Sequence, residues 1–160
     1  MMAIRTAILT ISDMCSQGKH ADTSGQTIEE MLPEDTFEVC QKIIIPDDYE
    51  TITRTLRRFS DEQNVQVVLT TGGTGLGPRD VTPEATTAVC DRRVPGFAEI
   101  LRSEGYKKTP NAVLSRGVSA MRDNTLIINL PGSPKAVREC MEIILEVLPH
   151  AVDMMRGGGH

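Results

Sequence analysis

A chain of 160 residues, 39% of them apolar, suits one domain that buries about 70% of the surface of its unfolded chain. The net charge of −5, with Lys and Arg scattered, argues against nucleic-acid binding, because phosphates demand a basic face. No apolar run reaches the ~18 residues that span a bilayer, and no charged-then-apolar leader opens the chain. We therefore expect a cytoplasmic protein without a membrane partner.

The four cysteines, at positions 15, 40, 90 and 140, are far apart and form no C-x-x-C pair. The three histidines form no H-E-x-x-H pattern. We therefore expect neither a zinc site nor a redox dithiol, and we interpret the cysteines as ordinary core or surface residues.

The segment 6–11 is apolar and is predicted to be a first buried strand, with Ser12 and Asp13 at its carboxyl end. These two residues either turn the chain, as Ser and Asp often do, or face a ligand. A polar loop over 15–22 leads to residues 23–25, which precede a predicted short helix that carries Ile28, Met31 and Leu32.

A second strand over 37–45 ends at Pro46, which cannot donate to a ladder. Asp47 and Asp48 follow, and either could cap the next helix. That helix is predicted from apolar side chains at helical spacing: Tyr49, Ile52, Leu56 and Phe59. Asp47 also lies directly beyond the carboxyl end of a strand, so a place at the sheet's edge is the alternative interpretation.

The central element is the apolar strand 65–69 followed by the glycine-rich turn 70–77. Missing Cβ atoms allow positive φ and let bare amides approach a phosphate. No Gly-Lys-Ser/Thr follows, and the dinucleotide glycine spacing is not kept, so the turn is neither a P-loop nor a Rossmann turn. Asp80 projects beside it, and Thr82 is expected to cap a helix over 83–89.

Beyond this turn, 97–101 indicates an amphipathic helix, and 112–117 is irregular. Arg116 is either an anion clamp, since guanidinium matches phosphate, or a solubilising side chain. The pair Asp123 and Asn124 predicts a hairpin, and therefore one antiparallel strand pair.

The last core strand, 126–130, precedes a turn over 131–134 in which Ser133 is expected to cap a helix. The amides at that helix's start and Lys135 add positive charge. We thus predict one α/β domain over 1–160, with three α/β/α layers, a mostly parallel, mixed sheet, and a flexible tail at 157–160.

The strand ends predict a rim where acids lie beside anion-binding amides, which favours phosphoryl or nucleotidyl transfer over acyl transfer or redox chemistry. Two carboxylates near a phosphate cradle, Asp47 and Asp80, can hold Mg²⁺.

Four motifs in order carry a resemblance: Ile11-Ser12-Asp13, Ile45-Pro46-Asp47, TTGGTGLGPRDVTPEAT from residue 70, and Asn129-Leu-Pro-Gly-Ser-Pro134. From about residue 4 to about residue 155, the chain resembles the molybdenum-cofactor biosynthesis family, which includes MogA, MoaB and the corresponding gephyrin domain. The resemblance implies a five-stranded mixed sheet, a homotrimer, and molybdopterin adenylyltransferase activity with MgATP. It also implies hand-over of the product to a molybdenum insertase.

Roles carried over from the family fall on matching positions. Asp47 and Asp80 would be catalytic and would position Mg²⁺ and the triphosphate. The phosphate cradle would be formed by Gly72, Gly73, Thr74 and Gly75. The pterin and its phosphate would be held by Ser12, Asp13, Ser115, Arg116, Pro131, Gly132, Ser133 and Lys135.

Two other functions are open from the sequence. One is a molybdopterin-binding paralogue that acts as carrier or regulator, since a pocket does not guarantee turnover. The second is an unrelated nucleotide-binding module that hydrolyses or senses ATP. Asp47 and Asp80 argue against the first, because a binder of a phosphorylated pterin gains nothing electrostatically from two more acids.

Overall fold

The computed structural model describes residues 2–158. In this range six strands form one sheet in the order β2-β1-β3-β6-β5-β4. The strands are β1 (Ile4–Ile11), β2 (Phe37–Ile45), β3 (Val67–Thr71), β4 (Arg92–Arg93), β5 (Ser119–Arg122) and β6 (Thr125–Leu130). The helices are α1 (Asp13–Ser16), α2 (Thr23–Met31), α3 (Tyr49–Asp61), α4 (Thr82–Val89), α5 (Pro95–Lys108), the 3-10 helix η1 (Pro110–Leu114), α6 (Pro134–Ile144) and α7 (Leu148–Met155).

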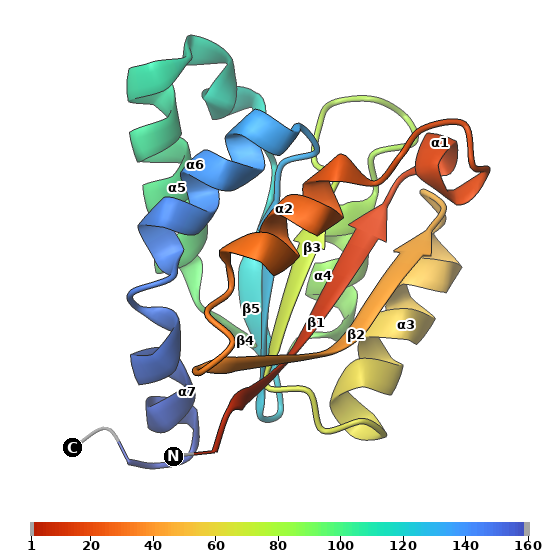
Figure 1. Cartoon of the computed structure of the whole chain (residues 1–160). Coiled ribbons are helices and arrows are strands. Elements are labelled where there is room, and N and C mark those ends of the chain that lie inside the picture. Colours follow the sequence, from red (N-terminus) through yellow and green to blue (C-terminus); the bar gives the residue numbers. More distant parts are fainter. Residues whose placement is uncertain (1, 159–160) are drawn as a thin grey trace.

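Helices cover both faces of the sheet, which confirms the three predicted layers. In Figure 1, α2 and α6 lie in front of the central strands, and α3 and α4 lie behind them. Alternate side chains of β1 explain the two cores: Ile4 and Ile8 pack on the α2 and α6 side, whereas Leu9 and Ile11 pack on the α3 and α4 side. A strand buried on both faces must be apolar almost throughout, as predicted.

The sheet is mixed, as expected, but it has six strands and not five. β1 pairs in parallel with β2 and β3, and β3 with β6. β5 and β6 form the expected antiparallel hairpin, in which Asp123 takes a φ of 49°. The extra strand is β4, whose residues Arg92 and Arg93 pair with Met121 and Ala120. Two residues are too few for a hydrophobic period to reveal a strand.

One predicted cap is wrong. Val81 precedes α4 without capping it through a side chain, and the Thr82 hydroxyl instead donates to the Gly72 carbonyl at 3.0 Å. The geometry of the glycine turn brings the Gly72 carbonyl within reach of this hydroxyl. The hydrogen bond then stabilises the turn. The expected cap of α6 is confirmed, since Ser133 Oγ accepts from the Ala136 amide at 3.2 Å.

At the carboxyl end, Gly157 takes a φ of 84° after α7. The Gly157 and Gly158 amides donate back to the carbonyls of Met154 and Asp153, a Schellman arrangement that ends the helix. Residues 159–160 of the predicted tail lie outside the described residues. Between residues 2 and 158 there is no helix with both the length and the apolar character needed to cross a bilayer.

Candidate functional site

The carboxyl ends of the four parallel strands β1, β2, β3 and β6 meet at one edge of the sheet, as predicted. The chain leaves β1 for β2 on one side and returns to β3 on the other, so the strand order reverses between β1 and β3. Ligands of open α/β sheets bind outside such a reversal.

A cavity of about 370 Å³ lies at this reversal. Six predicted site residues line it: Ser12, Asp47, Gly72, Gly73, Asp80 and Gly132. Residues without an assigned role also line it, among them Thr10, Cys15, His20 and Asp22. Asp47 and Asp80, which follow different strands, therefore face the same space as the glycine turn.

The choice between Asp47 and Asp48 is decided by hydrogen bonding. The Asp48 carboxylate accepts from the Thr51 amide at 2.9 Å and from the Thr51 hydroxyl at 2.6 Å, so Asp48 is the cap of α3. Asp47 is thereby left free of the helix and lines the cavity.

Asp13 and Asp47 are joined by two reciprocal hydrogen bonds, each from the backbone amide of one residue to the carboxylate of the other. The Asp13 amide donates to Asp47 Oδ2 at 2.9 Å, and the Asp47 amide donates to Asp13 Oδ1 at 3.0 Å. Arg79 then grips the Asp13 carboxylate with two hydrogen bonds of 3.0 Å each. Asp13 thus connects two loops and does not line the cavity itself.

Asp80 is positioned by its own loop. Its Oδ2 accepts from the Gly77 amide at 2.9 Å, and its amide donates to the Gly77 carbonyl at 3.1 Å. Arg116 supports this loop: its guanidinium donates to the Gly75 carbonyl at 2.8 Å, to the Asp80 carbonyl at 2.7 Å and to the Glu84 carboxylate at 2.6 Å. Arg116 thus supports the loop that carries Asp80, and an anion-clamp role for it stays a prediction.

The glycine turn brings bare backbone against its neighbours. Gly72 has a φ of 98°, and a Cβ on it would stand 2.2 Å from the Ile11 carbonyl oxygen. Gly73 has a φ of 68°, and its Cβ would stand 3.0 Å from Asp47 Oδ1. Only glycine allows β1, β3 and the Asp47 carboxylate to approach this closely.

The two linked acids differ in their electrostatics. Burial raises the pKa of Asp47, and the nearby charges of Asp13 and Asp80 raise it further against the lowering effect of the Asp13 amide. The hydrogen bonds from Arg79 lower the pKa of Asp13. Of these two, Asp47 is therefore the carboxylate whose negative charge the fold stabilises less.

This difference predicts that Asp47→Asn raises the melting temperature at neutral pH, by no more than about 3 °C. An acid with a raised pKa is penalised in the folded state above that pKa, and the penalty disappears as pH falls below it. The Asn oxygen can still accept the Asp13 amide. Thermal unfolding followed from about pH 7 to about pH 4 should show the two proteins converging; a variant clearly less stable at neutral pH would contradict this account.

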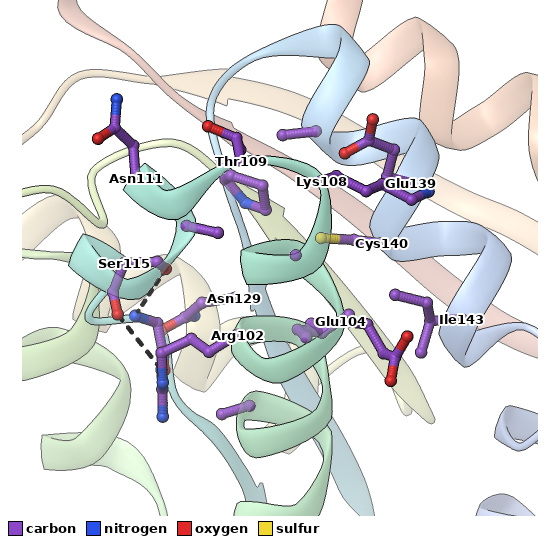
Figure 2. A pocket seen from close by; sticks show the side chains of 17 residues that line it. Arg102, Glu104, Lys108, Thr109, Asn111, Ser115, Asn129, Glu139, Cys140 and Ile143 are labelled. Atoms are coloured by element: carbon purple, nitrogen blue, oxygen red, sulfur yellow. Dashed lines mark hydrogen bonds between the residues drawn. The ribbon is translucent and has the colours of Figure 1, made fainter.

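Ser115 and Pro131 line a second cavity, of about 240 Å³, between α5, η1 and α6. Figure 2 shows it walled by these helices, with Ser115 and Asn129 at one side and Cys140 and Ile143 at the other. Its lining is mostly apolar, and Pro131, which lines it, is followed in the chain by Gly132, which lines the first cavity. Thr74, Gly75, Ser133 and Lys135 line neither cavity.

Sequence reasoning missed two residues that hold the site together. Arg79 stands inside the glycine-turn motif beside Asp80, and this position was the only available signal. Asn129 donates through Nδ2 to the Thr70 and Thr86 hydroxyls at 3.0 Å each, and its Oδ1 accepts from the Val118 amide at 3.1 Å. A polar residue within an apolar strand was its signal.

The donor set suits a metal that is completed by substrate. Across residues 2–158, no group of three or more His, Cys, Asp or Glu side chains is placed to hold an ion alone. Mg²⁺ typically uses one or two carboxylates together with substrate phosphates and water, which two acids beside bare amides can satisfy. Asp47 and Asp80 thus fit Mg²⁺ that arrives with a polyphosphate.

Comparison with known proteins gives consistent matches. Residues 7–150 match the family described as "Probable molybdopterin binding domain". The chain is 41% identical over 159 residues to a molybdopterin adenylyltransferase of Helicobacter pylori, covering 98% of this chain and 90% of that protein. It is 45% identical to the Drosophila melanogaster molybdenum cofactor synthesis protein cinnamon, covering 97% of this chain but only 26% of that longer protein.

Solved structures agree with these matches. The fold superposes with a TM-score of 0.91 on the molybdopterin biosynthesis enzyme MoaB from Thermus thermophilus, at 49% identity, covering 96% of this chain and 97% of that one. A structure of the Mog protein from Mycobacterium ulcerans gives a TM-score of 0.89 at 37% identity, covering 96% and 99%.

Proposed function

Because this chain belongs to the family of molybdopterin-binding domains, we propose that it is a molybdopterin adenylyltransferase that joins AMP from ATP to the terminal phosphate of molybdopterin. A phosphate oxygen of the pterin substrate attacks the α-phosphorus of ATP, and pyrophosphate leaves. The observation that carries the proposal is that Asp47 and Asp80 line one cavity together with Gly72 and Gly73.

The glycine turn and the two aspartates have different roles in the proposed reaction. The Gly72 amide donates to the Leu130 carbonyl at 3.3 Å, so it is the Gly73 amide that faces the polyphosphate and offsets negative charge. Asp47 and Asp80 would hold Mg²⁺, which would supply positive charge against the developing negative charge of the triphosphate. Two anionic groups repel each other in solution, so holding both in place supplies a large part of the rate.

The second cavity is the place that we propose for the pterin ring. A mostly apolar hollow with a few polar groups suits a flat heterocycle, and Ser115 offers such a group at one wall (Figure 2). Pro131 lines this cavity and the next residue, Gly132, lines the first one, so the phosphate end of a substrate held here extends toward the glycine turn. We further propose a homotrimer in the cytoplasm, which passes its product to a molybdenum insertase.

Purified protein incubated with molybdopterin and MgATP tests the activity directly. We expect adenylylated pterin and an equal amount of pyrophosphate. Pterin binding without either product would indicate a carrier, and ATP hydrolysis without pterin binding would indicate an unrelated nucleotide-binding module.

A further inference from the structure

We propose that Arg79, acting through Asp13, is a positioning residue that sets how Asp47 and Asp80 face each other for divalent-metal binding; this inference rests on the proposed function. Arg79 does not line the cavity. Its side chain is 65% exposed, and it reaches the site only through the Asp13 carboxylate.

The Asp13 carboxylate has little capacity left for a ligand. Its Oδ1 accepts from the Asp47 amide and from Arg79 Nη2, and its Oδ2 accepts from Arg79 Nε, each at 3.0 Å. A guanidinium fork on a carboxylate fixes direction as well as distance. Asp13 is thus oriented by Arg79 and in turn orients its neighbour.

The oriented Asp13 in turn fixes the direction of the Asp47 carboxylate. The Asp13 amide occupies Asp47 Oδ2 at 2.9 Å, so Oδ1 is the oxygen turned toward the glycine turn, where a Cβ on Gly73 would stand 3.0 Å away. Two reciprocal hydrogen bonds join the Asp13 and Asp47 loops, and the Arg79 side chain connects this pair to a third loop.

That third loop carries Asp80, the residue next to Arg79. The hydrogen bonds between Asp80 and Gly77 close the loop into a tight turn, so the position of Arg79 and that of Asp80 are coupled. The Arg79 fork therefore connects the loops that follow β1, β2 and β3. An exposed ion pair adds little to stability, so we expect its contribution to lie in the spacing of the two metal-binding carboxylates.

The experiment measures Mn²⁺ binding by electron paramagnetic resonance in the presence of α,β-methylene-ATP, which cannot be cleaved at the reacting bond. We expect Arg79→Met and Asp13→Asn each to weaken Mn²⁺ binding by about 10-fold, as loss of a group that orients a metal ligand does. Because both changes break the same connection, the double variant should bind no more weakly than about either single one. Arg79→Lys keeps the charge but loses the fork, and should also bind more weakly than wild type.

Arg122→Lys is the matched control. Arg122 grips Asp61 with the same fork, at 3.0 and 2.7 Å, far from the cavity at the other end of the sheet. It should leave Mn²⁺ binding unchanged, and pterin affinity should stay within about twofold for the Arg79 and Arg122 variants. Melting temperatures within about 3 °C of wild type show that each protein is folded.

Three results would overturn the inference. The first is unchanged Mn²⁺ binding in Arg79→Met, and the second is additive losses of Mn²⁺ affinity in the double variant. The third is weaker binding of α,β-methylene-ATP, measured without metal, in Arg79→Met but not in Asp13→Asn. The last would mean that Arg79 touches the polyphosphate itself. The proposed function is tested separately by wild-type turnover: if the Mn²⁺ pattern holds but no adenylylated pterin forms, the function is wrong and the positioning role stands.

Discussion

Asp80→Asn is expected to lower the rate of adenylylation about 1,000-fold while molybdopterin still binds. Removing one preorganised group that stabilises charge in the transition state typically lowers the catalytic rate by two to three orders of magnitude. The Asn side chain keeps an oxygen that can accept the Gly77 amide, which Asp80 now accepts at 2.9 Å, so the loop should keep its shape. Single-turnover formation of pyrophosphate, with pterin affinity measured by fluorescence, separates the two effects.

The control for this prediction is Asp48→Asn. It removes a neighbouring carboxylate that caps α3, and Asn caps a helix about as well as Asp, so turnover should stay close to wild type. Equal loss of turnover and pterin affinity in Asp80→Asn would make Asp80 a structural residue. Turnover close to wild type would remove Asp80 from the chemistry.

Gly72→Ala is expected to lower the free energy of unfolding by at least about 3 kcal/mol, or to prevent folding. The new Cβ would stand 2.2 Å from the Ile11 carbonyl oxygen, a backbone atom of the adjacent strand that cannot rotate away. The φ of 98° adds strain for any residue with a side chain. Strands β1 and β3 would have to separate at the point where the cavity lies.

Urea unfolding, or the soluble yield if the variant fails to fold, measures the effect. Gly96→Ala is the control of opposite sign, because Gly96 lies in α5 and a Cβ added there would meet no heavy atom within 4 Å. Alanine at this position should stabilise the protein by about 0.4–1 kcal/mol. A Gly72→Ala protein within about 1 kcal/mol of wild type would show that the turn relaxes more easily than its contacts suggest.

Much of the fold could be predicted because it depends on neighbours in the chain. The buried strand over 6–11 and the hairpin at Asp123 and Asn124 are local properties, and the structure confirms them in β1 and in the β5–β6 pair. The sixth strand could not be predicted, because Arg92 and Arg93 are a strand only through their pairing with β5. The cap expected of Thr82 was wrong for a similar reason: its hydroxyl finds a carbonyl ten residues earlier, brought near by the turn.

The candidate site divides in the same way. The sequence by itself determined that acids and bare glycines follow the ends of buried strands, and that those ends share one edge of the sheet. It could not decide whether Asp47 or Asp48 caps the helix. It also could not reveal that Arg79 and Asp13 join three loops, or that Ser115 lines a second cavity. Those facts belong to the tertiary structure alone, because hydrogen bonds and burial between distant loops exist only after the sheet has brought the loops together.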